Sequence, residues 1–342
     1  MRNFLASFLA LSSLADHVSN ALTVKPRQEL PLPVETLTHF NVTPTWLENI
    51  DVRSNGEVLA TNIGEGILYG LTPSSGQLPR VVHSFLESNG LNTLLGIVEF
   101  SPDVFAVVVG NNSNLLPIAD TFSLWRVDFH SNPTNVSKIA DLTGAQLPNG
   151  LAVISENDEL ILVAESAFGE IWSVNVNTGV IATTVKVPEM YPVGAGAVPL
   201  EVNGIKVRDG QLYWTNTLLE SLYRVQIDSQ GYQKNGSQVH TVVQANYLID
   251  DFTFDPLGNI WLMGNGNNTL LVVPEGSSSV IPVAGNNFST ILAGCSASHF
   301  GRTANDFYVL YATTTGGVYY PVNGTITEPG KIAAIDTRGY YA

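Results

Sequence analysis

The chain has 342 residues, of which 44% are hydrophobic and 13% charged, so its composition is that of a folded protein able to bury a large core. It carries 15 Lys and Arg against 30 Asp and Glu, a formal net charge of −15. That balance argues against nucleic acid or an anionic membrane as a partner. The lone Cys295 cannot form an intramolecular disulfide, and we expect it to be a small buried residue.

The N-terminus has the pattern of a secretory signal peptide over residues 1–21. Arg2 precedes a short apolar run from Phe4 to Leu14, and small residues near Ala15 or Ala21 offer a cleavage site. The run is shorter than the ~20 residues that span a bilayer. We therefore expect no membrane partner and a location in the secretory pathway, either secreted or in an endomembrane lumen. A retained anchor is the alternative that stays open.

Seven N-glycosylation sequons agree with entry into the secretory pathway. Each has the form Asn-x-Ser/Thr, and together they predict a glycoprotein. They begin at Asn41, Asn111, Asn135, Asn235, Asn267, Asn287 and Asn323.

An internal repeat organises the rest of the chain. Asn203-Gly204-Ile205 opens an alternating run that passes through an Asp209-Gly210 turn into a second run, the signature of a β-hairpin. The same arrangement recurs at spacings of 46 to 54 residues. Six repeats result, and they begin at residues 48, 95, 149, 203, 250 and 296.

Each repeat predicts a series of short antiparallel strands. Second strands are expected over residues 57–61, 104–109, 160–164, 211–215, 260–263 and 307–312. Third strands follow, as at residues 123–127, 170–174 and 221–225, and most repeats add a fourth, as at residues 180–187.

Four antiparallel strands in about 50 residues are typical of a propeller blade. The sequence therefore predicts an all-β fold, a six-bladed β-propeller with four-stranded antiparallel blades, spanning residues 22–342. Residues 31–40 precede the first repeat. We expect them to supply the outermost strand of the last blade and so to join the two ends of the chain.

The first residues of the repeats should meet at one mouth of the central channel. They are Glu48, Leu95, Asn149, Asn203, Asp250 and Ser296. Carboxylate and amide oxygens are the ligands that Ca²⁺ and Mg²⁺ prefer. The alternative is that these polar side chains cap turns at the strand starts. His299, on the sixth first strand, is either an acid–base group or a structural histidine.

The chain resembles the six-bladed propellers of the senescence-marker-protein/gluconolactonase-like family over roughly residues 40 to 342. The motifs are Asn203-Gly204-Ile205 followed by 212–215 (Leu-Tyr-Trp-Thr), and 250–255 (Asp-Asp-Phe-Thr-Phe-Asp) followed by 258–261 (Gly-Asn-Ile-Trp). This resemblance implies a divalent cation held by Glu48, Asn203 and Asp250. It also implies that Asn149 contacts substrate and that Asp250 is the base in lactone hydrolysis.

Two departures from the family pattern argue against a sugar lactone as substrate. Glu48 is followed by Asn49-Ile50 where the family has Gly-Pro, and Asp250 is followed by Asp251 where the family has Gly. The family's basic sugar-binding residue near the metal is not evident either.

In general character the chain is similar to a fungal branch of this family, the hetero-Diels–Alderases of tropolonic sesquiterpene biosynthesis. That resemblance implies a secondary-metabolite cyclase that joins a tropolone-type quinone methide to a sesquiterpene in a preorganised pocket. The partner would be a small-molecule substrate, with either no cofactor or one divalent cation, Ca²⁺ or Mg²⁺, at the channel mouth.

The candidate residues for such a reaction fall into three groups. The acid–base candidates are Glu48, Asp250 and His299. Substrate contacts are expected from Asn149, Asn203, Asp251 and Ser296, and aromatic lining from Trp46, Phe168, Tyr191 and Tyr247.

Two other functions stay open. One is a metal-dependent lactonase or related hydrolase, in which the cation polarises a carbonyl and Asp250 or Asp251 is the base. The other is a non-catalytic propeller that binds a ligand. The sequence contains no Gly-x-Ser-x-Gly elbow, no phosphate-binding loop and no Cys/His zinc spacing.

Overall fold

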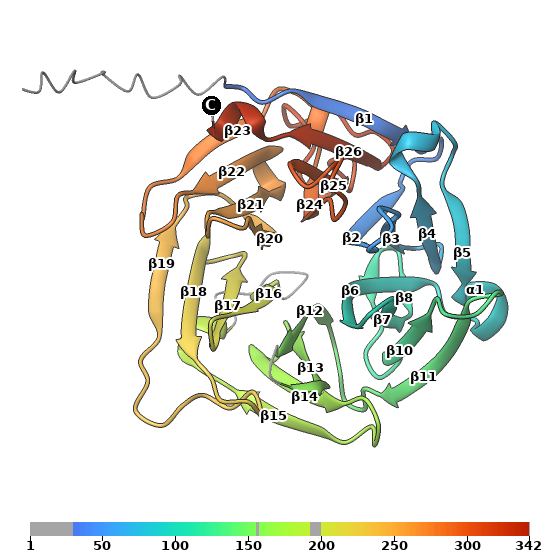
Figure 1. Cartoon of the computed structure of the whole chain (residues 1–342), viewed down its shortest axis with the longest axis vertical. Coiled ribbons are helices and arrows are strands. Elements are labelled where there is room, and N and C mark those ends of the chain that lie inside the picture. Colours follow the sequence, from blue (N-terminus) through green and yellow to red (C-terminus); the bar gives the residue numbers. More distant parts are fainter. Residues whose placement is uncertain (1–29, 155–156, 192–199, 342) are drawn as a thin grey trace, which may run out of the picture.

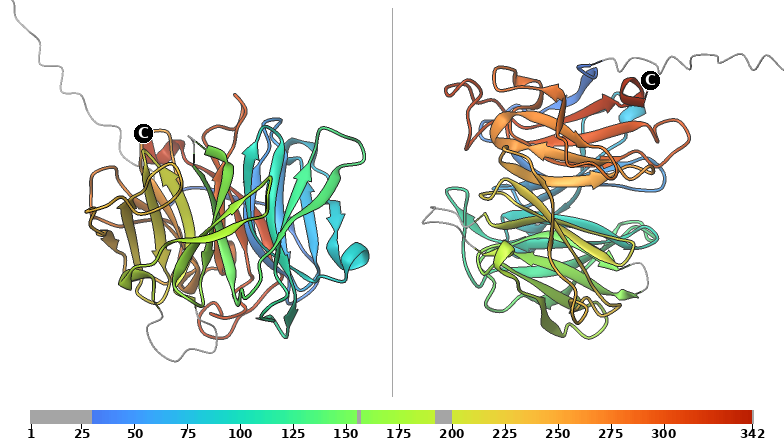
Figure 2. Two further views of the ribbon diagram at one scale, coloured as in Figure 1. Left: turned by 90° about the horizontal axis from the view of Figure 1, so that it is seen from below. Right: turned by 90° about the vertical axis from the view of Figure 1, so that its left-hand side faces the viewer.

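The computed structural model describes residues 30–154, 157–191 and 200–341. In this part of the chain, antiparallel sheets form a ring about a central axis (Figure 1). Seen from the side, the strands run from one face of the ring to the other (Figure 2). The prediction of an all-β propeller built from four-stranded antiparallel sheets is confirmed. The predicted signal peptide lies outside the described residues.

The strands follow the chain in units of four. They are β2 (Trp46–Val52), β3 (Val58–Ile63), β4 (Ile67–Leu71) and β5 (Arg80–Ser84); β6 (Thr93–Ser101), β7 (Val104–Gly110), β10 (Ser123–Asp128) and β11 (Asn135–Asp141); β12 (Pro148–Ile154), β13 (Asn157–Glu165), β14 (Glu170–Asn175) and β15 (Ile181–Val185); β16 (Val202–Arg208), β17 (Gln211–Asn216), β18 (Ser221–Gln226) and β19 (His240–Gln244); β20 (Ile249–Phe254), β21 (Ile260–Gly264), β22 (Thr269–Val273) and β23 (Ile281–Gly285); and β24 (Cys295–Phe300), β25 (Val309–Thr314) and β26 (Lys331–Asp336) with β1 (Val34–His39). The first two units form one eight-stranded sheet, joined by a single bridge between Ile63 and Thr93.

A few short elements sit between the strands. They are the helices α1 (Phe85–Asn89) and α2 (Arg338–Tyr341), the hairpin strands β8 (Asn112–Ser113) and β9 (Leu116–Pro117), and 3₁₀ turns at Pro73–Ser75, Pro188–Met190, Asn265–Asn267 and Thr290–Leu292. Among the described residues, no helix has the length and apolar character that crossing a bilayer requires.

The ring is closed by the N-terminal strand. β1 pairs antiparallel with β26, with Val34 opposite Ile335 and His39 opposite Lys331, and the two strands lie side by side in Figure 1. The prediction that residues 31–40 supply the outermost strand of the last unit is confirmed. Closure of this kind leaves fewer free sheet edges.

The inner strand of every unit has a bulge at the same place. The register shifts at residues 48–49, 95–96, 149–150, 203–204, 250–251 and 296–297. A bulge inserts one residue and turns side chains away from the ladder. The positions that the repeat aligns are therefore the positions that leave the sheet pairing and face the axis.

Threonine hydroxyls satisfy backbone groups that the bulges leave unpaired. Thr215 Oγ1 accepts from the Gly204 amide at 3.0 Å and donates to the Asp250 carbonyl at 2.6 Å. Thr61 Oγ1 accepts from the Asn49 amide at 2.9 Å in the first unit. These bonds compensate buried polar groups that would otherwise be costly, and the bond from Thr215 to Asp250 also ties the fourth unit to the fifth.

Glycine is required in three of the bulges because neighbouring inner strands pack backbone to backbone. A Cβ on Gly96 would lie 2.3 Å from the Asn149 carbonyl oxygen, and one on Gly150 would lie 2.4 Å from that of Asn203. A Cβ on Gly204 would lie 2.7 Å from the Asp251 Cα. The need for glycine is thus steric, and it explains why an Asn-Gly pair precedes a strand in this sequence.

The core fills the spaces between neighbouring sheets. Trp214, Phe252 and Trp261 are fully buried there. Cys295 is fully buried as predicted, with Sγ 3.6 Å from the Thr269 carbonyl oxygen, and burial raises the pKa of its thiol.

Among the sequon asparagines, five are exposed and two, Asn111 and Asn267, are partly buried. Their glycosylation stays a prediction.

The close approach of the inner strands predicts a large cost for Gly150→Ala. The added methyl would overlap a backbone carbonyl that cannot move aside, so we expect a loss of at least about 3 kcal/mol in the free energy of unfolding. Gly210→Ala is the control, because Gly210 has open space but φ +68° and should cost only about 1–2 kcal/mol. Urea unfolding of both variants measures the difference. Equal losses would contradict the steric argument.

Candidate functional site

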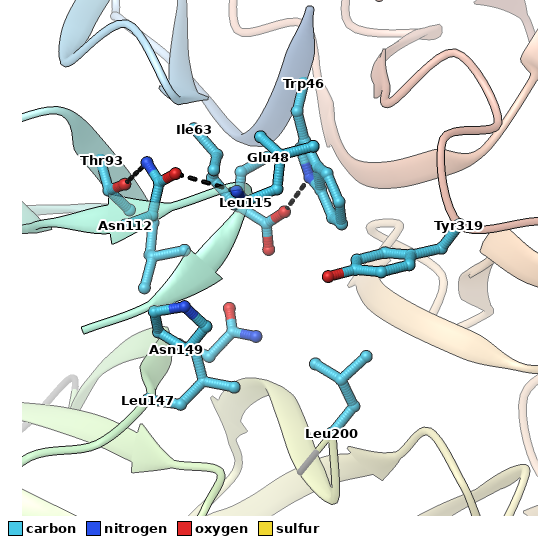
Figure 3. Close-up of a pocket in the computed structure, with 12 residues that line it drawn as sticks. Trp46, Glu48, Ile63, Thr93, Asn112, Leu115, Leu147, Asn149, Leu200 and Tyr319 are labelled. Atoms are coloured by element: carbon cyan, nitrogen blue, oxygen red, sulfur yellow. Dashed lines mark hydrogen bonds between the residues drawn. The ribbon is translucent and has the colours of Figure 1, made fainter. Parts of the chain in front are cut away.

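Four of the predicted residues meet at one mouth of the channel. Glu48, Asn149, Asn203 and Asp250 line two adjacent cavities that share Trp46, Glu48, Asn149, Leu200 and Tyr319. In Figure 3 the polar atoms of Glu48, Asn149 and Tyr319 face the same space. Residues as far apart in sequence as 48 and 250 are thereby brought together by the ring.

Glu48 is a buried carboxyl group set among apolar side chains. Its Oε2 accepts a hydrogen bond of 2.5 Å from Trp46 Nε1 (Figure 3). Burial raises the pKa of Glu48 to about 7; the Trp46 bond lowers it and the Asp251 charge raises it. A carboxyl with this pKa is partly protonated near neutral pH, so it can both give and take a proton.

Asp250 is the second buried carboxyl group of the site. Its Oδ1 accepts from Asn203 Nδ2 and its Oδ2 from Asn265 Nδ2, both at 2.8 Å. Burial first, and then the charge of Glu48, raise the pKa of Asp250 well above its ordinary value. Because each negative charge opposes the other, the pair retains a proton at a pH where exposed carboxyls are ionised.

Asn149 leaves a hydrogen-bonding group unused in the site. Its Oδ1 is buried and has no hydrogen-bond partner among the described residues. Buried acceptors are nearly always paired in folded proteins. The Asn149 oxygen therefore suits a ligand that brings a hydrogen-bond donor or a cation.

The donor set is chemically suited to a hard divalent cation. Two carboxylates and the amide oxygens of Asn149 and Asn203 are oxygen ligands of the kind that Ca²⁺ and Mg²⁺ take. Ligation by Asp250 would require the amide NH₂ groups that now donate to it to turn away. Within the described ranges, no group of three or more His, Cys, Asp or Glu side chains is arranged to hold a metal.

The rim carries residues that the sequence analysis missed. Tyr319 and Tyr320 come from the loop between β25 and β26, and Asn265 from the 3₁₀ turn after β21. The Tyr319 ring packs edge-on against Trp46 with centroids 5.0 Å apart. Burial, and then the Glu48 charge, raise the Tyr319 pKa. The available signal was the Gly- and Asn-rich run at residues 264–268 and the paired tyrosines.

The walls of the site are largely apolar. They include Ile63, Leu95, Leu115, Leu147 and Leu200. Trp46 lines both cavities as predicted, whereas Phe168, Tyr191 and Tyr247 are not among the lining residues. Each cavity has a free volume of about 40 Å³, which is room for roughly three water molecules. A larger ligand requires rim side chains to move.

His299 lies in a different cavity, which is a correction to the predicted site. Its Nδ1 is 2.7 Å from the Phe300 carbonyl oxygen, and its Nε2 is 3.4 Å from Asp51 Oδ1. It lines a cavity with Asn49, Asp51 and Lys206. The reason is the position of His299 along the inner strand β24, three residues beyond Ser296. Three residues advance an extended chain by about 10 Å.

Asp251 and Ser296 also have partners outside the Glu48 cavities. Asp251 accepts from Lys206 Nζ at 2.8 and 3.0 Å and from Asn49 Nδ2 at 3.2 Å. Ser296 Oγ donates to the Leu47 carbonyl at 2.8 Å. Neither residue lines the cavities at Glu48, so both serve to join one unit to another.

Comparison with known proteins agrees with the expected resemblance. A fungal protein from Phoma sp. that carries the provisional name hetero-Diels-Alderase is 28% identical, over 83% of this chain and 87% of its own length. A second, from Sarocladium schorii with the same provisional name, is 25% identical over 91% of this chain and 85% of its own. The chain is similar in sequence to proteins provisionally named hetero-Diels-Alderases.

Solved structures show the same fold at low identity. A calcium-binding protein, regucalcin, from Agrobacterium tumefaciens superposes with a TM-score of 0.61 and 16% identity, covering 90% of this chain and 94% of its own. A gluconolactonase from Xanthomonas campestris gives 0.58 and 13%, covering 92% of each chain. No protein-family model matches the sequence. The expected likeness to gluconolactonase-like propellers therefore holds for the fold.

The raised pKa of Glu48 predicts how stability depends on pH. The folded state holds this proton more tightly than the unfolded state, where the value is 4.5. The resulting stabilisation is full below pH 4.5 and is lost as the pH rises through about 7. The loss is roughly 3 kcal/mol at most.

Glu48→Gln removes this titration and is its direct test. We expect the stability of the wild type, measured relative to Glu48→Gln by urea unfolding, to fall between pH 4.5 and pH 8. Glu87→Gln, at an exposed position on α1, controls for loss of a charge and should follow the wild-type profile. Parallel profiles for wild type and Glu48→Gln would contradict the raised pKa.

Proposed function

We propose that this protein is a cyclase of the hetero-Diels-Alderase type, acting on a tropolone-type quinone methide and a sesquiterpene. The observation that carries the proposal is a buried carboxyl group, Glu48, with a pKa of about 7 in an apolar-walled cavity. Two relatives provisionally named for this activity, which match 83% and 91% of the chain, support it.

The first step we propose is the loss of water that forms the quinone methide. Glu48 gives its proton to the leaving hydroxyl, the carbon–oxygen bond breaks and water departs. The ring hydroxyl of the substrate then returns a proton to the Glu48 carboxylate, so the net change is the loss of one water. A group with a pKa near 7 is suited to both transfers.

The second step is the cycloaddition itself, which transfers no proton. The alkene of the terpene adds across the oxygen-containing diene, so that one carbon–carbon and one carbon–oxygen bond form. Holding the two partners together is worth on the order of 7–11 kcal/mol in good cases. The Glu48 carboxyl or the Tyr319 hydroxyl would donate to the reacting oxygen and stabilise the charge that develops there.

For a quinone methide and a sesquiterpene to enter the site, side chains of the rim must move. The free volume of about 40 Å³ in each cavity is far below the ~300–1,000 Å³ of ligand pockets. Tyr319, which is 40% exposed and sits on a loop, is the side chain we expect to swing aside. Its contact with Trp46 would be broken in the complex.

A metal-dependent lactonase or related hydrolase is the second candidate. The unpartnered Asn149 oxygen beside two buried carboxyls favours it. Glu48, Asn203 and Asp250 would hold the cation, and the cation would supply Lewis-acid polarisation of a carbonyl. In this case Asn149 would position the substrate.

We also propose that the protein works in the secretory pathway. The exposure of Asn41, Asn135, Asn235, Asn287 and Asn323 supports this location, since glycosylation needs accessible sequons.

The cyclase proposal predicts that Glu48→Gln lowers turnover of a hydroxymethyl tropolone precursor and an alkene by about 10²–10⁴-fold, the usual size of acid–base catalysis. Product formation is followed by chromatography with mass detection. Glu87→Gln should retain activity, and His299→Asn, in the other cavity, should retain it too. Full activity in Glu48→Gln would exclude the acid role. An equal loss in His299→Asn would show that the two cavities act together.

The two candidate functions respond differently to metal removal. The cyclase is expected to keep its activity after treatment with chelator, while the lactonase would lose lactone hydrolysis and recover it on adding Ca²⁺ or Mg²⁺. Thermal melting gives a second readout, since a bound cation would raise the melting temperature of the wild type but not of Asp250→Asn. A chelator-sensitive cyclisation would contradict the metal-free mechanism.

A further inference from the structure

A separate cavity lies between the fourth and fifth units. It has a volume of about 300 Å³ and shares no lining residue with the two cavities at Glu48. Asn203 stands near the start of β16 and Arg208 at its end, so this cavity lies toward the opposite face of the ring. The residues used below that line it are Arg208, Tyr213, Arg224, Phe254 and Glu275.

Arg224 lines this cavity, and one N–H donor of its guanidinium has no acceptor among the described residues. Its Nη1 donates to the Tyr213 hydroxyl at 3.3 Å, and its Cζ lies 5.9 Å from the centre of that ring. Its Nε is buried and has no partner among the described residues. A buried charged donor without an acceptor is destabilising, so a ligand acceptor at this position would be favourable.

Arg208 supplies a second guanidinium to the same space. Its Cζ lies 5.0 Å from the centre of the Phe254 ring, and its Nη1 donates to the Asp255 carbonyl at 3.3 Å. Its nearest carboxylate oxygen is Asp209 Oδ2 at 3.5 Å, from a side chain that is 86% exposed. An exposed contact of this kind contributes little.

In this chain, which has twice as many acidic as basic residues, most described arginines have a carboxylate partner, whereas Arg224 and Arg126 have none among the described residues. Arg53, Arg80, Arg302 and Arg338 are each paired with a carboxylate. Arg224 instead rests on an aromatic ring, and Tyr213 and Phe254 pack edge-on at 5.0 Å to form the floor. Contacts with these two rings position the two guanidiniums in the absence of a ligand.

We propose that this cavity binds the oxyanion group of a small molecule, a carboxylate or a phosphate. A guanidinium offers parallel N–H donors that match two oxygens of such a group, and the buried Arg224 Nε lacks an acceptor of this kind. Glu275 and Asp209 also border the cavity. Both are exposed, and their charges favour a single oxyanion group over a polyanion.

Thermal melting of the full chain with phosphate, sulfate or acetate, each against chloride at equal ionic strength, tests the proposal. We expect at least one of the three to raise the melting temperature in a saturable manner. Arg224→Met should abolish the rise. The larger response, to phosphate or to acetate, identifies which oxyanion the site prefers.

Arg126→Met is the matched control. Arg126 occupies the same place in a third strand, Ser-Leu-Trp-Arg-Val against Ser-Leu-Tyr-Arg-Val, but its Nη2 donates to the Val176 carbonyl at 3.4 Å and it does not line this cavity. This variant should keep the full rise. If Arg224→Met does not fold, Arg208→Met and Tyr213→Phe take its place, with a reduced rise expected in each.

Two results would overturn the proposal. One is the absence of a saturable rise with all three anions at tens of millimolar. The other is an equal rise in the wild type and in the cavity variants, which would show a general salt effect. Neither result depends on the activity at Glu48.

Discussion

The packing of inner strands about one axis is the constraint on which the rest of the structure depends. Each inner strand bulges at the same step, and in three of them a glycine lets the backbone touch its neighbour. Side chains next to those contacts cannot turn back into the sheet. They converge at one mouth, so residues from distant parts of the sequence share two cavities of about 40 Å³ each.

That convergence sets the chemistry of the site through electrostatics. Glu48 and Asp250 are both buried, neither has an ion-pair partner among the described residues, and the pKa of each is raised. Glu57 shows the contrast within the same protein, because Arg53 and Arg80 pair with its carboxylate and its pKa is lowered. Glu57 is therefore paired with two cations, whereas the two carboxyls at the mouth have none among the described residues.

The sequence predicted those features that the repeat carries. The strand positions, the closure by residues 34–39 and the meeting of Glu48, Asn149, Asn203 and Asp250 all follow from one pattern applied six times. Asn265 and Tyr319 were missed because they come from loops whose lengths differ between units. His299 was assigned to the wrong end of the channel because the repeat identifies its strand but not the distance of the residue along that strand. The cavity at Arg224 is lined by residues of two neighbouring units, so no single stretch of the sequence predicts it.

The central claim is that Glu48 and Asp250, from distant parts of the sequence, form one buried pair in which the charge of Glu48 raises the pKa of Asp250. Infrared titration of the protonated carboxyl band, in the wild type and in Glu48→Gln, measures this directly. The account predicts a band in the wild type that persists above pH 6 and loses intensity near the Glu48 pKa of about 7, and a lower titration point for Asp250 in Glu48→Gln, where residue 48 carries no charge. Wild-type and variant spectra in which Asp250 titrates at the same pH would contradict it, since the two groups would then not share a site.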